Sequence, residues 1–398
     1  MDNPEFARFE SLLQPPMEAD KLQDAVDNIS RSLQRMYHHP PGGSPEIKSF
    51  AMAAIECVQS PEEYPEFNQV LQSFVSSRQD KRHKGLKLPD YQAQLLRIGF
   101  QYVLMDMDPA YPAGGRDTDK WHGWFGAILE NPYRRAMLED ALWANDNQAN
   151  DEKRYAGGKI AIAAYADRLP AELSLIDVGC SAGLGPIQLG ENLPFSDFKI
   201  KASGYAGRLI RKALRRNLNL KVNAGLDKVP EINWPWVEAC SYYPHELTNV
   251  RRKYLRGLLF RKHDGFSFVQ GDITKGETAE GLQGARKLVP GGKYLVGMAF
   301  NSMYEVDPPE LGRAMNSFES LASGLAIVQD AVKISRKDPR RLEFAADIYD
   351  HPYNLVCKDL TVPNQPYVLL GTWSSFRCGT FTATEYLEDR LEAVQRLL

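Results

Sequence analysis

The segment that most constrains the fold is a short β-type run that ends in a glycine-rich turn, Leu175-Ile-Asp-Val-Gly-Cys-Ser-Ala-Gly-Leu-Gly185. Glycine at 179 and 183 lets the backbone turn sharply and approach a ligand closely, as strand-to-helix connections of open α/β sheets require. Ligands of such sheets bind beyond the carboxyl ends of the strands. The turn therefore predicts a parallel sheet with a ligand site beside it.

Short β-branched or aromatic runs alternate with helical stretches from Pro170 onward, which is typical of a sheet covered by helices. The last two runs are separated by only three residues, so they predict an antiparallel hairpin at a sheet edge. We expect an α/β fold with a Rossmann-like, mostly parallel, seven-stranded sheet that ends in this hairpin. The predicted strands cover residues 174–178, 222–226, 266–270, 293–299, 325–330, 367–374 and 378–382.

The chain before Pro170 carries apolar residues at helical spacing and no strand alternation. Residues 1–36 end at a His-His-Pro-Pro-Gly-Gly cluster that cannot continue a helix. Further helices are predicted near 45–58, 64–78, 88–105, 133–145 and 150–168. We therefore expect a helical arm and linker over 1–44, a helical cap region over 45–170, and the Rossmann-like domain over 171–398.

The composition is that of an average globular chain, with 43% hydrophobic and 25% charged residues. A formal net charge of −3 argues against a broad nucleic-acid or anionic-membrane surface. The basic stretch at 208–216 is interpreted as a solvated helix face, with binding of an acidic substrate or RNA as the alternative. The five cysteines are widely separated, which favours a reducing compartment, and no apolar run reaches bilayer length. We expect a cytoplasmic protein with a small-molecule partner and no metal. The sequence is compatible with a homodimer.

The glycine-rich turn departs from two phosphate-binding patterns. A dinucleotide fingerprint reads G-x-G-x-x-G, but Ser181 and Leu184 occupy its second and third glycine positions when the motif starts at Gly179. A P-loop is disfavoured too, because Gly157-Gly-Lys159 is followed by isoleucine rather than by serine or threonine. A ligand without phosphate tolerates these departures more easily.

The run Asp177-x-Gly179-x-Ser181-x-Gly183 resembles the acidic-x-Gly-x-Gly-x-Gly signature of class I S-adenosylmethionine-dependent methyltransferases, with serine in place of the middle glycine. With its flanking segments the chain resembles, more closely, an uncharacterised bacterial family that has a helical N-terminal region and a methyltransferase-like C-terminal domain. The segments that carry this likeness are Asn147 to Arg154, the turn itself, and Gly225-Leu-Asp-Lys-Val-Pro230.

The resemblance implies S-adenosyl-L-methionine as cofactor and roles for several residues. Asp177, Gly179 and Gly183 would line the methionine moiety, Asp227 would accept from the ribose hydroxyls, and Asp272 would contact the adenine amino group. Asp227 lies 44 residues after Gly183, so the intervening segment must hold an insertion. The remaining predicted cofactor contacts are Cys180, Ser181, Gly271, Ile273 and Phe300.

Candidates for the acceptor side come from several segments. Asn301 and Tyr304 follow the fourth predicted strand, where methyltransferases often place acceptor-orienting groups, and His245 titrates near neutral pH and could act as a general base. For each of these three residues, the alternative to a catalytic role is an ordinary position in the core or on the surface. The residues that could line or contact an acceptor pocket are Trp121, Trp124, Asn150 and Arg154. The alternative for the two tryptophans is core packing, and the alternative for Asn150 and Arg154 is a polar contact between domains.

The expected activity is methyl transfer to an oxygen or nitrogen nucleophile of a small molecule. The sequence shows no obvious cluster of catalytic acids, bases or metal ligands. Two alternatives therefore stay open: a module that binds an adenosyl ligand for sensing or partner binding without methyl transfer, and a methyltransferase-fold enzyme with different chemistry.

Overall fold

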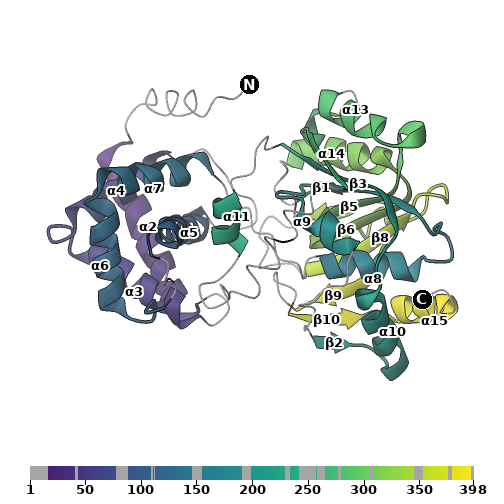
Figure 1. The fold of residues 1–398 in the computed structure, drawn as a ribbon, viewed down its shortest axis with the longest axis horizontal. Coiled ribbons are helices and arrows are strands. Elements are labelled where there is room, and N and C mark those ends of the chain that lie inside the picture. The colour runs from purple at the N-terminus through teal and green to yellow at the C-terminus, as the bar shows by residue number, and fades with distance from the viewer. Residues whose placement is uncertain are drawn as a thin grey trace. The chain divides into compact units, whose positions relative to one another are not determined.

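The chain of 398 residues folds into α-helices and one mixed β-sheet in the computed structural model, drawn in Figure 1. It divides into two compact units, Met1–Ala149 with Asn233–Arg252, and Asn150–Ile232 with Lys253–Leu398. The sequence pattern predicts a domain boundary at residue 170. The structure describes residues 17–40, 44–77, 88–108, 111, 113–145, 155–190, 199–228, 234–241, 257, 265–276, 279–300, 302–303, 306, 308–344, 353–374 and 379–395.

The first unit is helical, as predicted. Two of its helices start with proline after a capping side chain: Ser44 Oγ accepts from the Ile47 N–H, and Asn131 accepts from the two N–H groups that follow Pro132. Its helices are α2 (Ala19–His38), α3 (Pro45–Gln59), α4 (Pro65–Ser77), α5 (Leu88–Met107), α6 (Thr118–Leu129), α7 (Pro132–Ala144) and α11 (Trp234–Ser241).

Aromatic rings form much of the core of this helical unit. The Phe100 ring lies 4.6 Å from that of Phe125 and stacks on that of Phe67, while Trp121 meets Phe50 edge-on. The helix α11 belongs here although it follows β3 in the chain, because the Gln101 amide of α5 donates to a backbone carbonyl of α11 at 2.7 Å. The segment between β3 and β4 thus supplies a core helix to the helical unit, whereas the insertion predicted between Gly183 and Asp227 contains β2 and α10.

The second unit is built on a single sheet, which has ten strands in the described part of the chain, three more than predicted. Its order is β2-β10-β9-β8-β6-β5-β1-β3-β4, with β7 paired to β6. The strands are β1 (Leu173–Val178), β2 (Lys199–Lys201), β3 (Leu220–Asp227), β4 (Phe266–Gln270), β5 (Tyr294–Phe300), β6 (Ala322–Ile334), β7 (Leu342–Phe344), β8 (Tyr353–Asp359), β9 (Val368–Trp373) and β10 (Thr380–Ala383).

The sheet is parallel on one side and largely antiparallel on the other. The strands β4, β3, β1, β5 and β6 pair in parallel, whereas β6, β8, β9 and β10 pair antiparallel in turn. The chain proceeds from β1 to β3 and β4 on one side, then returns to β5 on the other. The strand order therefore reverses at β1, the point where open sheets bind ligands. The predicted terminal hairpin is present as β9 and β10.

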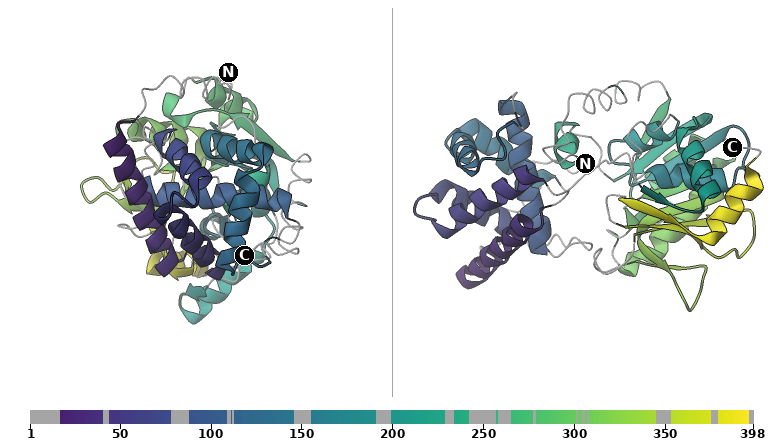
Figure 2. Two further views of the ribbon diagram at one scale, coloured as in Figure 1. Left: turned by 90° about the vertical axis from the view of Figure 1, so that its left-hand side faces the viewer. Right: turned by 90° about the horizontal axis from the view of Figure 1, so that it is seen from below.

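Helices cover both faces of this sheet (Figures 1 and 2). Neighbouring residues of β1 point to opposite faces: Leu175 belongs to one hydrophobic cluster and Ile176 to the other. The first cluster includes α8 (Ala156–Ala164), α9 (Leu184–Leu189), α10 (Gly204–Arg215) and α15 (Glu385–Val394). The second includes α13 (Glu280–Lys287), α14 (Pro308–Leu321) and the short helix η5 (Ile273–Lys275). The connection before β5 contains the short helix η6 (Pro290–Gly292).

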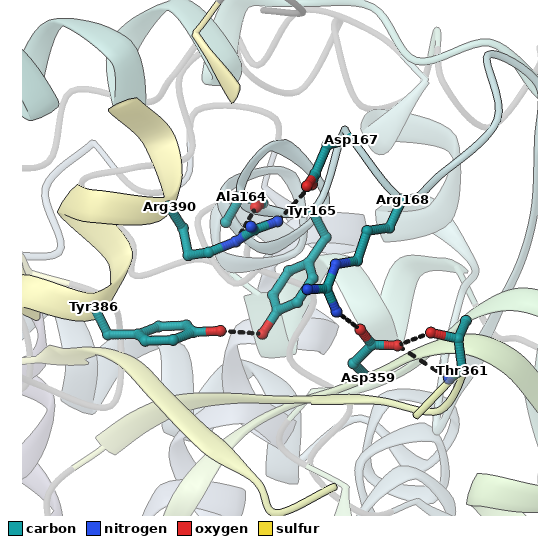
Figure 3. A network of polar contacts seen from close by, with 8 residues as sticks. All are labelled: Ala164, Tyr165, Asp167, Arg168, Asp359, Thr361, Tyr386 and Arg390. Carbon is teal, nitrogen blue, oxygen red and sulfur yellow. Dashed lines mark hydrogen bonds and ion pairs between the residues drawn. The ribbon is translucent and has the colours of Figure 1, made fainter. Parts of the chain in front are cut away.

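A polar network joins α8, α15 and the end of β8 (Figure 3). The hydroxyls of Tyr165 and Tyr386 lie 3.1 Å apart, and Arg390 donates to a backbone carbonyl at the end of α8 at 3.1 Å. Arg168 forms an ion pair with the buried Asp359. These contacts fix α8 to the sheet, and they explain why this helix belongs to the second unit rather than to the helical one.

Candidate functional site

The candidate site lies at the carboxyl ends of β1, β3, β4 and β5. Register brings these ends together: Val178 of β1 pairs with Leu226 of β3 and with Ala299 of β5, and Asp227 pairs with Gln270 of β4. The turn 179–183 links β1 to α9 at this edge. The segments that follow the strands therefore meet around the switch point of the sheet.

The turn has an unusual backbone. Gly179, Ser181 and Gly183 all have positive φ, at 74°, 48° and 70°. Glycine adopts this region readily, whereas a serine there is strained. The Gly179 N–H donates to Leu226 O at 2.8 Å, so the start of the turn is hydrogen-bonded to β3. The backbone of the turn favours glycine at positions 179 and 183, and the serine between them adopts an energetically unfavourable conformation.

Protein side chains pack directly against both glycines. A Cβ on Gly179 would lie 2.4 Å from the Cβ of Ser302, and one on Gly183 would lie 2.5 Å from the ring of Phe266. Ser302 Oγ in turn donates to Val178 O at 3.0 Å, which holds the segment after β5 against the turn. Packing and positive φ together account for glycine at 179 and 183, whether or not a ligand binds.

Asp227 and Ser181 form the polar centre of the site. The Ser181 N–H donates to Asp227 Oδ2 at 2.7 Å, and the Gly271 N–H donates to the Asp227 backbone carbonyl at 2.9 Å. The Asp227 side chain is partly exposed. Ser181 Oγ is buried and has no hydrogen-bond partner among the described residues. A carboxylate and a buried hydroxyl oxygen thus lie at the same turn, and the hydroxyl has hydrogen-bonding capacity left for a ligand.

The other predicted cofactor residues take varied positions. Asp177 is 1% exposed at the end of β1, and Cys180 packs against Gly225 in the core. Asp272 is the N-cap of η5: its carboxylate accepts from the backbone N–H and the hydroxyl of Thr274 at 2.9 and 2.7 Å. Ile273 and Phe300 are buried.

Three residues at this edge were not predicted from the sequence. Ser302 lies between the two residues chosen after β5. Asp330 of β6 accepts from the Met303 N–H at 3.2 Å and so anchors the same segment. Tyr155 packs its ring over Gly185 and meets Phe300 at 5.4 Å. An aspartate inside an apolar strand was a usable signal for Asp330, whereas nothing in the sequence singles out Tyr155.

Seven residues remain of the predicted set. Asn150, Arg154, His245, Asn301 and Tyr304 lie outside the described residues. Trp121 and Trp124 are buried in the helical unit, and the Trp121 indole N–H donates to Gly115 O at 2.7 Å. Their rings lie 5.0 Å apart in an edge-to-face contact. Core packing therefore accounts for both tryptophans.

The charge around the turn is acidic. The turn 179–185 contains no lysine or arginine; Asp177 lies near the end of β1, Asp227 ends β3 and is followed by Lys228, and Asp272 follows β4. Such surroundings favour a cationic or neutral ligand over a phosphate. The described residues include no cluster of three or more His, Cys, Asp or Glu side chains arranged to hold a metal ion.

Comparisons with known proteins add no relative: no protein-family model, curated protein or solved structure matches this chain. Among the helices that the structure describes, none has both the length and the apolar character to cross a membrane.

Proposed function

We propose that the second unit is a Rossmann-like domain of the methyltransferase type that binds S-adenosyl-L-methionine and transfers its methyl group to an oxygen or nitrogen of a small molecule. The supporting observation is the pair formed by Asp227 and Ser181 at the switch point of the sheet. The parallel strands β4, β3, β1, β5 and β6 correspond to the five alternating strands expected of such a sheet. The antiparallel strands β8, β9 and β10 extend it.

The residues of the turn fit this cofactor in charge and in hydrogen bonding. The cofactor carries a sulfonium and an ammonium group and no phosphate, which suits a turn, residues 179–185, that has no lysine or arginine and lies between Asp177 and Asp227. Its ribose diol can donate to a carboxylate, the role proposed for Asp227. Ser181 Oγ, buried without a partner among the described residues, would bond to the bound cofactor.

The cofactor brings an electrophilic methyl group, and the protein's contribution would be binding and orientation. Asp227 would hold the ribose while its contact to the Ser181 N–H keeps the turn in place. Ser302 and Asp330 would fix the segment after β5, which includes the predicted acceptor-side residues Asn301 and Tyr304. Positioning of the acceptor against the methyl group would supply much of the rate.

Calorimetric titration with S-adenosylmethionine and S-adenosylhomocysteine tests the cofactor. We expect both ligands to bind the full chain, and Asp227→Asn to weaken binding about tenfold to hundredfold, the effect of losing a charged hydrogen bond. Asparagine can still accept from the Ser181 N–H, so the turn should keep its shape. Asp338→Asn is the matched control, because Asp338 pairs with Arg340 and Arg341 in the turn between β6 and β7 and contacts no described residue of the proposed site.

Two results would contradict the cofactor assignment: no heat with either ligand, or equal affinity of wild type and Asp227→Asn. If the cofactor binds, formation of S-adenosylhomocysteine over a panel of small-molecule acceptors tests the transfer itself. Binding without product across the panel would replace methyl transfer by the sensing or partner-binding role.

A further inference from the structure

One face of α10 gathers positive charge although the chain as a whole is slightly acidic. Residues 199–226 contain eight lysines and arginines and no aspartate or glutamate. Within α10 the apolar side chains point into the core, so the cations occupy the opposite, exposed face. The buried residues of the helix are Ala206, Leu209, Ile210, Ala213 and Leu214.

Five of these cations line a shallow hollow of about 550 Å³, which we call the cationic face: Arg208, Arg211, Lys212, Arg215 and Arg216. No ion pair holds Arg211, Lys212 or Arg215 within the part of the chain that the structure describes. Like charges three or four positions apart on a helix cost roughly 0.2–0.5 kcal/mol per pair. Only the last turn gains from cations, through the helix dipole. The stability of α10 therefore does not account for the number of positive charges on the cationic face.

A second hollow, of about 290 Å³, adjoins the cationic face and shares Arg216 with it. Its walls are mostly apolar, with the two exposed amides Asn217 and Asn219 and the Lys159 side chain as polar members. We call it the base groove. Its apolar lining consists of Ile162, Ala163, Ala166, Leu169, Pro170, Ala171, Leu173, Ala213 and Leu218.

Lys159 lines the base groove and is hydrogen-bonded to the end of α10, which carries the cationic face. This lysine is buried, and its Nζ donates to the backbone carbonyls of Leu214 and Arg216 at 3.3 and 2.8 Å. It thus caps the carboxyl end of α10 and holds that end beside the base groove. The groove includes Leu173, the first residue of β1, whereas the proposed cofactor turn follows Val178, the last. The two sites therefore lie at opposite ends of the same strand.

An exposed aromatic ring lies at the other end of the helix. Tyr205 is 39% exposed, its hydroxyl donates to Gln395, and the Arg208 guanidinium lies 5.2 Å from its ring. A ring held in this way can stack with a base. Glu388 of α15 accepts from the Ser203 N–H, so an acidic side chain lies beside the first turn of α10.

We propose that this surface binds single-stranded nucleic acid, with phosphates on the cationic face and one unstacked base in the base groove. Residues 208–215 span about 10 Å along the helix, the length of two to three phosphates. Base stacking on aromatic rings and apolar pockets for splayed bases are the usual features of single-strand recognition. A membrane is disfavoured, because the apolar face of α10 is buried in the core and cannot insert.

Fluorescence anisotropy of a labelled 12-nucleotide single-stranded RNA, and of the matching DNA, tests the proposal on the full chain over a salt series. We expect saturable binding whose affinity falls with salt. The double variant Arg211→Gln with Lys212→Gln should bind about tenfold more weakly and lower the slope of log K against log salt by about 1.4. The control is Arg336→Gln with Lys337→Gln, an equal charge change in the exposed turn after β6, which should leave binding unchanged.

The base groove is tested separately by Ala166→Trp, which fills it. This variant should weaken RNA binding several-fold but leave binding of inorganic polyphosphate unaltered, because polyphosphate has no base. The proposal is overturned if no oligonucleotide binds at low salt, if the two double variants behave alike, or if anionic phosphatidylserine vesicles bind while RNA does not. It is also overturned if Ala166→Trp affects both ligands equally. Circular dichroism of the same variants checks folding, and titration with S-adenosylmethionine reads the proposed cofactor site independently.

Discussion

The aromatic core of the helical unit and the turn after β1 use polar groups in opposite ways. In the core, Trp121 donates its indole N–H to Gly115 O, and the Asn68 amide donates to Cys57 O at 2.7 Å. In the turn, Ser181 is strained at positive φ, and its hydroxyl oxygen is buried with no partner among the described residues. In the helical core, these buried polar groups are hydrogen-bonded, as a stable fold requires. The turn keeps two features that lower stability, which is expected where a site is retained for binding.

Removing the central ring of the helical core should have the largest effect. We expect Trp121→Ala to lower the free energy of unfolding of the helical unit by about 3–5 kcal/mol, because it empties a buried aromatic position. Urea unfolding followed by circular dichroism measures this loss. Tyr133→Ala on α7 is the control: that ring is 75% exposed, so the change should stay within about 0.5 kcal/mol. Equal effects of the two variants would contradict the role assigned to Trp121.

Relief of the serine strain in the turn should separate stability from binding. Left-handed backbone costs a non-glycine residue about 1–2 kcal/mol, and glycine costs about 0.5–1 kcal/mol in chain entropy. Ser181→Gly should therefore raise the free energy of unfolding by about 0.5–1 kcal/mol. It should also weaken S-adenosylmethionine binding about fivefold through the lost hydroxyl.

Asn364 provides the matched comparison, since it is the other non-glycine residue with positive φ among those described, at 58°. Asn364→Gly should change stability slightly and leave binding unaltered, because asparagine tolerates this region. Urea unfolding and calorimetry give both readings. A Ser181→Gly protein that binds like wild type would show that the hydroxyl has no part in ligand recognition.

Acid should remove the contribution of one paired carboxylate in each unit. Burial raises the pKa of Glu46 in the helical unit, but hydrogen bonds from Arg116 and Ser44 outweigh it and leave the pKa below its ordinary 4.5. Burial likewise raises the pKa of Asp359, and hydrogen bonds from Thr361 and Arg168 leave it below 3.8. A lowered pKa adds stability above the ordinary value, and this is lost as pH falls through the folded-state pKa.

The stability that Glu46 adds to the helical unit should thus start to fall as the pH drops below about 4.5, and that added by Asp359 to the sheet unit as it drops below about 3.8. Hydrogen exchange of each unit between about pH 7 and pH 3 measures both. Glu46→Gln should cost about 1 kcal/mol at neutral pH, the difference between a charged and a neutral hydrogen bond. Its difference from wild type should vanish at low pH. A difference that persists unchanged in acid would exclude ionisation of Glu46 as its origin.

Much of the sheet could be predicted because its parallel strands are bounded by turns and helices. The predicted strand 266–270 matches β4, and the run at 174–178 differs from β1 by one residue. The strands β2 and β7 were missed because three residues are too few to display a period. The strand β8 was missed although it is central: it is buried on both faces, so its residues do not alternate between apolar and polar.

The site was predictable where a residue type is tied to a backbone requirement. Gly179 and Gly183 have the positive φ that a tight turn after a strand needs. The contact of Asp227 with the Ser181 N–H spans 46 positions and could not be read from spacing, because α9, β2 and α10 separate the turn after β1 from the end of β3. Asp272 is predicted as a cofactor contact, and in the structure it caps η5, a common role of aspartate at the start of a helix.

By itself, the sequence determined the helical first region, the alternation of strands and helices after it, and the glycine turn, because local periodicity and backbone sterics act over a few residues. Only the tertiary structure decided that Ser181 meets Asp227, that Ser302 and Phe266 pack on the glycines, and that the cations of α10 share one face beside a groove. Those relations depend on strand order and helix burial, which join residues far apart in the chain.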